Sequence, residues 1–269
     1  MSKSKVFLSH THSEQELATK IKDELLDPHL LGALDIFVSS DSTTNLPGTS
    51  WLHNIEDSLT TANVILILAS PFSIQKPWIN IEAGAGWIRY LQARDHGGTP
   101  VYVMPLCHSG LYPGKLPLPW STFNSVELRT QGGLHNILDT CARAADLRRS
   151  PKPDLSDLLE NIINLEAFYS KYREIAQKIN NVVKILSILP SDFLQPLPAN
   201  HVRSLKRVRQ AVLNQAEADL LWLQEKGYID YSQESVMVDA GAGTFIDVIF
   251  RPKEDFLQNV APNIQHYIE

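Results

Sequence analysis

The stretch Asn63-Val64-Ile65-Leu66-Ile67-Leu68-Ala69-Ser70 decides the fold of this chain. A strand with one wet face alternates apolar and polar residues, whereas an unbroken apolar run predicts a strand that is buried on both faces. Strands of this kind occur in parallel sheets that are covered by helices on both sides. The stretch therefore predicts the centre of a parallel sheet.

Strands and helices alternate on either side of this run through the first half of the chain. Further strands are predicted at 5–9, 34–38, 99–106 and 125–128. Helices are predicted from Ser13, whose spacing to Glu16 suits a capping box, over 51–59, from Pro77, and from Gly133 to near Arg149. This alternation predicts an α/β domain with a flavodoxin-like, doubly wound parallel sheet.

The second half of the chain has a different pattern. The proline-containing segment 150–153 predicts a linker between a first domain, 1–149, and a mainly helical C-terminal module, 154–269. Apolar residues recur every three or four positions from Leu155 to Leu186, which predicts a long helix that packs in a bundle or on another copy of the chain.

A second long helix is predicted over 202–226, followed by a small β-hairpin with a turn at 241–243. This end of the chain weakly resembles a winged helix. A cluster of basic residues on the predicted helix is interpreted as a solvated face; it comprises Arg203, Lys206, Arg207 and Arg209.

Composition excludes several classes of protein. Of the 269 residues, 43% are hydrophobic and 20% charged, as in globular proteins. The net charge of −6 argues against a nucleic-acid-binding protein, which needs a basic face. No apolar run is long enough to span a membrane, and no signal peptide is evident, so a cytoplasmic protein is expected. Cys107 and Cys141 have no metal-binding spacing, so no metal site is expected.

Residues at the carboxyl ends of the predicted strands are the first candidates for a site, because ligands of doubly wound sheets bind beyond these ends. These positions are Ser9-His10, Ser39-Ser40-Asp41, Ala69-Ser70 and Leu106-Cys107. His10 and His12 are interpreted from their spacing as solvated loop histidines rather than a metal pair. No phosphate-binding glycine motif follows a strand.

Five segments occur in an order that is specific in combination. They are 5–10 (KVFLSH), 35–39 (DIFVS), 41–51 with Gly48 and Trp51, 62–70 (ANVILILAS), and the W-x-x-x-E motif from Trp78 to Glu82. Together they resemble a Toll/interleukin-1 receptor (TIR) domain of the bacterial, NAD-cleaving type, over about residues 4–148.

The resemblance implies a catalytic role for Glu82. In enzymatic members of the family, the glutamate of W-x-x-x-E is the catalytic residue of an NAD⁺ glycohydrolase. The residues are compatible with that chemistry, because Trp78 and Glu82 share a helix face. A carboxylate beside the ribose stabilises the positive charge that develops when the bond to nicotinamide breaks. NAD⁺ is then the substrate, and no cofactor is implied.

The resemblance also implies contacts with the substrate at other positions. Those positions are Phe7, Ser9, His10, Ser39, Asp41, Gly48 and Trp78. Asp41 is expected to replace an acidic residue that many members carry at the position of Ser39. Trp51 is more consistent with core packing.

Three functions stay open at this point. The first is an NAD⁺ glycohydrolase that acts in antiphage defence by depleting NAD⁺. The others are a TIR cyclase that makes a cyclic ADP-ribose signal and a non-enzymatic TIR adaptor. Trp78 and Glu82 favour an enzyme. Self-association through TIR domains is implied, and residues 155–189 are expected to control activity through assembly or to bind a trigger or partner protein.

Overall fold

The computed structural model describes residues 3–30, 32–39, 51–196 and 203–268. The chain divides into two compact units, residues 1–167 and 168–269. Within the described ranges, no helix is long and apolar enough to cross a bilayer.

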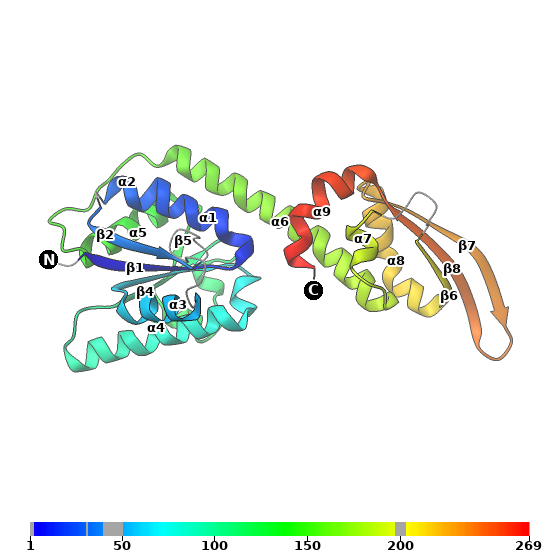
Figure 1. Cartoon of the computed structure of the whole chain (residues 1–269), viewed down its shortest axis with the longest axis horizontal. Helices are drawn as coiled ribbons and strands as arrows, with labels where there is room; N and C mark the ends of the chain where they lie inside the picture. Colours follow the sequence, from blue (N-terminus) through cyan, green and yellow to red (C-terminus); the bar gives the residue numbers. More distant parts are fainter. Residues whose placement is uncertain (1–2, 31, 40–50, 197–202, 269) are drawn as a thin grey trace. The chain divides into compact units, whose positions relative to one another are not determined.

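The first unit is built on a five-stranded parallel sheet (Figure 1). Its strands are β1 (Ser4–Ser9), β2 (Leu34–Val38), β3 (Val64–Ala69), β4 (Tyr102–Cys107) and β5 (Val126–Glu127). The strand order is β2-β1-β3-β4-β5, which is the flavodoxin-like order and confirms the predicted fold. All of β3 is buried, as its apolar run required.

Helices cover both faces of this sheet (Figure 1). On one face lie α1 (Gln15–Lys20), the turn Ile21–Leu26 that continues it into α2 (Asp27–His29), and α5 (Gln131–Ala144). On the other face lie α3 (Trp51–Thr61) and α4 (Pro77–His96). The first residue of α4 is a proline, as predicted, and Gly97 ends the helix with a φ of 69°.

The connection from β1 to α1 begins with a cap that differs from the prediction. Thr11 and Glu14 form the capping box, so the predicted box from Ser13 to Glu16 is wrong. The Glu14 carboxylate accepts hydrogen bonds from the Thr11 backbone amide at 3.1 Å and from Thr11 Oγ1 at 2.8 Å. The box is shifted by two residues because Glu14 turns inward and is fully buried.

A single long helix, α6 (Ser156–Leu186), confirms the periodicity that begins at Leu155. Asp154 Oδ1 accepts a hydrogen bond from the Ser156 amide at 3.0 Å, which caps the helix. The boundary between the two compact units falls inside this helix, after Ala167.

The proline segment 150–153, predicted as the linker, is held against α5. Lys152 Nζ lies 2.8 Å from both carboxylate oxygens of Asp139, and His135 Nε2 lies 3.0 Å from the Pro153 carbonyl oxygen. These contacts explain why the first turns of α6 belong to the compact unit that contains the sheet.

The second unit combines helices with a small antiparallel sheet. Its elements after α6 are α7 (Ser191–Leu194), β6 (Arg203–Arg209), α8 (Gln210–Glu225), β7 (Ile229–Asp239), β8 (Gly243–Pro252) and α9 (Ala261–Ile264). The strand order is β6-β8-β7. In its core, the rings of Phe193 and Phe250 stack at 4.8 Å.

The predicted helix over 202–226 is wrong for residues 203–209, which form β6. Leu205 pairs with Val248 and Val208 with Ile246, and a β-bulge lies between them. The bulge adds one residue, at which Arg207 has a φ of 57°. Leu205 and Val208 are three positions apart, a spacing that is also typical of one face of a helix. Here the spacing results from a bulge in a strand.

Arg203 does not lie on a solvated helix face, so that interpretation of the basic cluster is wrong for this residue. Its side chain is buried, and Nη2 donates to the carbonyl of Gln195, which follows α7, and lies 3.4 Å from the carbonyl oxygen of Ser191, the first residue of α7. Burial lowers the pKa of this guanidinium. Arg207, in contrast, is exposed.

Candidate functional site at the carboxyl end of the sheet

Glu82 lies in the second turn of α4, at the carboxyl end of β1. Its Oε2 accepts a hydrogen bond from Ser9 Oγ, and its Oε1 accepts one from Trp78 Nε1 at 2.8 Å. Only 1% of the residue is exposed. The chain order reverses between β1 and β3, which is the switch point where ligands bind in flavodoxin-like folds.

The surroundings of Glu82 change its acidity. Burial raises its pKa to about 7, because an apolar environment disfavours the charged carboxylate. The hydrogen bonds from Ser9 and Trp78 lower the pKa, but by less than burial raises it. No basic side chain is among these causes, so a positive charge brought by a ligand would favour the carboxylate form.

His10 is the next residue after Ser9 and belongs to the same site. It is 6% exposed, so the interpretation as a solvated loop histidine is wrong. Its Nδ1 lies 3.1 Å from Ser39 Oγ, which comes directly after β2. Burial lowers the pKa of His10 to about 4, so its ring is neutral at pH 7.

The remaining predicted site residues differ in their placement. Phe7 is fully buried and stacks on Phe37, so it packs in the core and presents no surface to a ligand. Trp78 is 36% exposed while it donates to Glu82, which suits a wall of the site. Asp41 and Gly48 lie outside the described residues.

A second buried cluster lies at the same edge of the sheet, and the sequence analysis missed it. Ser70 Oγ, directly after β3, donates to Glu14 Oε1 at 2.7 Å and lies 3.1 Å from Ser73 Oγ. His108 Nε2, directly after β4, lies 3.1 Å from Glu14 Oε1. The sequence contained one signal for this cluster, the position of Ser70 directly after a predicted strand. Nothing in the sequence indicated that Glu14 would be its partner.

In this second cluster the pKa of the carboxyl group is lowered, whereas the pKa of Glu82 is raised. Burial by itself raises the pKa of Glu14. The contacts with His108, Ser70 and the Thr11 amide lower the pKa by more than burial raises it, so that the net pKa is about 2. Glu14 is therefore charged at pH 7. It ties the connection after β1 to the ends of β3 and β4, which fixes the loop that carries His10.

The cysteines take no part in this chemistry. Cys107 and Cys141 are buried free thiols, and burial raises their pKa values to about 11 and about 12. Both are protonated at neutral pH, which makes them poor nucleophiles. In the part of the chain that the structure describes, no group of three potential metal ligands occurs.

Comparison with known proteins agrees with this arrangement. Residues 6–138 match the family model of the TIR domain. These residues form a TIR domain. The match begins within β1 and covers the other four strands of the sheet together with α3, α4 and Glu82. Among curated proteins, none matches the sequence.

Proposed function

We propose that the TIR domain is an NAD⁺ glycohydrolase and that Glu82 is its catalytic carboxylate. The observation that supports this most directly is the buried Glu82 carboxylate, held by Ser9 and Trp78 at the carboxyl edge of β1. A carboxyl group with a raised pKa in an apolar site is typical of catalytic positions.

The proposed reaction uses the charge of the substrate. The nicotinamide ring of NAD⁺ is cationic, so its arrival favours the ionised form of Glu82. When the bond between nicotinamide and ribose breaks, its electron pair leaves with nicotinamide, and the positive charge moves to the ribose. The carboxylate stabilises that charge, and nicotinamide leaves as a neutral molecule without needing an acid. Water then adds to the ribose and releases a proton, which gives ADP-ribose.

Neighbouring groups position this carboxylate. Ser9 and Trp78 engage both of its oxygens, and ribose hydroxyls would exchange with these donors on binding. His10 is neutral at pH 7, so it does not repel the cationic nicotinamide ring. Because the fold already positions the carboxylate, no free energy is needed to reorient it during the reaction.

The decisive test is Glu82→Gln in the full chain. The substitution keeps the shape of the side chain and removes the negative charge, so kcat should fall by about 10²–10³-fold. Glu56→Gln, on the exposed surface of α3, is the matched control and should retain wild-type turnover. A folded Glu82→Gln protein with near wild-type turnover would contradict the proposal; circular dichroism monitors folding.

The same assay separates the other functions. Mass spectrometry of the products distinguishes ADP-ribose from a cyclic ADP-ribose, and no turnover at any protein concentration would leave the adaptor function. We further propose that cleavage serves antiphage defence by depleting cytoplasmic NAD⁺. Self-association through the TIR domain, and assembly or partner binding through residues 154–269, would then control it.

A further inference from the structure

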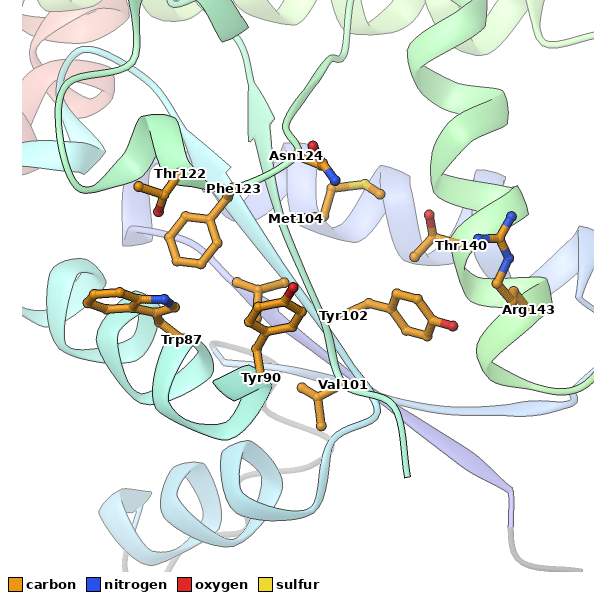
Figure 2. A pocket seen from close by; sticks show the side chains of 11 residues that line it. Trp87, Tyr90, Val101, Tyr102, Met104, Thr122, Phe123, Asn124, Thr140 and Arg143 are labelled. Atoms are coloured by element: carbon orange, nitrogen blue, oxygen red, sulfur yellow. The ribbon is translucent and has the colours of Figure 1, made fainter. Parts of the chain in front are cut away.

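A separate cavity of about 270 Å³ lies in the first unit, away from Glu82 (Figure 2). Trp87 and Tyr90 of α4 line it from one face of the sheet, and Thr140 and Arg143 of α5 line it from the other. Val101 and residues 102–104 of β4 lie between them. The cavity therefore wraps around an edge of the sheet.

That edge is open because β5 is short. β5 pairs only with Leu106 and Cys107, so no strand of the described chain pairs with the first half of β4 on this side. The Tyr102 amide donates to Asn63 on the β3 side at 2.9 Å. Peptide groups alternate in direction along a strand, so the N–H and C=O of Val103 point to the open edge. One hydrogen-bond donor and one acceptor therefore face the cavity side by side.

The cavity changes character along its length (Figure 2). Trp87, Tyr90 and Phe123 gather at one end and provide aromatic surfaces. The hydroxyl groups of Tyr102 and Thr140 lie toward the other end, where Arg143 supplies a positive charge. The order from one end to the other is aromatic, hydroxyl and cationic.

We propose that this cavity binds a nucleoside monophosphate. The base lies against Trp87, Tyr90 and Phe123, where stacking on aromatic side chains is favourable, and its polar edge pairs with the peptide of Val103. The sugar lies beside the hydroxyls of Tyr102 and Thr140. The phosphate binds Arg143, whose guanidinium matches phosphate geometry.

Size and edge geometry favour this ligand over the alternatives. A volume of about 270 Å³ is just below the usual range for ligand sites, which suits a mononucleotide better than a dinucleotide such as NAD⁺. An extended peptide needs a longer edge. Here the open edge is only a few residues long, because Pro105 has no N–H and pairing with β5 begins at Leu106.

Calorimetric titration of the full chain with AMP tests the proposal. AMP should bind at one site about tenfold more tightly than adenosine, because a hydrogen-bonded charge pair contributes at least that factor. Inorganic phosphate alone should not saturate the site. Arg143→Gln should reduce AMP affinity to that of adenosine, and Trp87→Ala should weaken both ligands. The exposed neighbours Arg149→Gln and Ile88→Ala are matched controls and should bind AMP like the wild type.

Further variants keep the outcome decisive. If Trp87→Ala fails to fold, Thr140→Leu narrows the middle of the cavity without adding charge and should weaken AMP binding. Glu82→Gln should bind AMP with unchanged affinity, and Arg143→Gln should leave the KM of any NAD⁺ cleavage unchanged. Equal AMP affinity in the wild type and Arg143→Gln would overturn the proposal. So would AMP binding that depends on Glu82, or a cavity that binds only an extended peptide or a second copy of the chain.

Discussion

Glu82 and Glu14 are both buried at the carboxyl edge of the same sheet, but their acidities move in opposite directions. Glu82 is 1% exposed and has a pKa near 7, whereas Glu14 is fully buried and has a pKa near 2. Both accept a hydrogen bond from a serine that ends or follows a strand. The difference is His108, which lies 3.1 Å from Glu14 and has no counterpart among the causes that act on Glu82.

This comparison separates a structural carboxylate from a reactive one. Glu14 already accepts hydrogen bonds from Ser70 and the Thr11 amide and lies 3.1 Å from His108, so its ionised form stabilises the fold. Glu82 has only neutral donors, so its ionised form costs free energy until a cationic ligand arrives. Burial alone therefore does not distinguish the two carboxylates; the raised pKa of Glu82, which has fewer stabilising contacts, is what supports its proposed catalytic role.

The largest expected difference is between the stabilities of two variants, each of which lacks the charge of one of these carboxylates. Glu14→Gln should lower the free energy of unfolding by at least about 3 kcal/mol at pH 7, because it weakens the buried contacts of the carboxylate with Ser70, the Thr11 amide and His108, and a hydrogen bond to a charged group contributes about 1.5–3 kcal/mol. Glu82→Gln should not destabilise the fold, because it removes a carboxylate that is costly to ionise. Urea denaturation of both variants measures this. The contrast between the two clusters is wrong if both variants lose similar stability.

The pH dependence of stability should distinguish the two carboxylates next. An ordinary glutamate has a pKa of 4.5, and Glu82 has about 7 in the fold, so the folded protein binds this proton more strongly. The resulting stabilisation is present below pH 4.5 and is lost as the pH rises to about 7. Relative to wild type, Glu82→Gln should therefore gain up to about 3 kcal/mol between pH 4.5 and pH 7.

Glu14 should act in the opposite sense and in another pH range. Its pKa is below 4.5 in the fold, so its stabilisation is present above pH 4.5 and is lost as the pH falls toward 2. The wild type and Glu82→Gln share this loss, so it cancels in their difference. A flat difference between pH 4.5 and 7 would show that Glu82 has an ordinary pKa.

The smallest effects should come from the two serines. Ser9→Ala removes a donor to Glu82, so the acidic limb of the NAD⁺ cleavage profile should move to higher pH, with a cost of about 1 kcal/mol in kcat/KM. Ser70→Ala should lower stability by about 1 kcal/mol and leave the profile in place, because His108 still holds Glu14. Equal shifts of the pH profile in both variants would contradict the separation of the clusters.

The comparison also explains which parts of the site could be predicted. The W-x-x-x-E spacing placed Trp78 and Glu82 on one helix face, and their hydrogen bond agrees with it. The position of Ser9 at the end of a strand brought it to the same edge. The partnership of Glu14 with His108 joins residues 94 positions apart in the numbering, and no local pattern encodes it.

Local periodicity by itself determined the sheet and the long helix. An unbroken apolar run can be satisfied only by burial on both faces, so β3 had to be a central strand. The spacing from Leu155 onward fixed α6 in the same way. Both are properties of consecutive residues, which a single sequence contains.

Only the tertiary structure decided the strand β6, the burial of His10 and the acidities of the carboxylates. The spacing of Leu205 and Val208 fits a helix and a bulged strand equally well, and pairing with β8 selects the strand. The pKa of a carboxyl group depends on what surrounds it in space. Glu14 and Glu82 are the same residue type at the same edge, and the presence or absence of His108 makes one a structural anion and the other a group that is poised between its charged and neutral forms at pH 7.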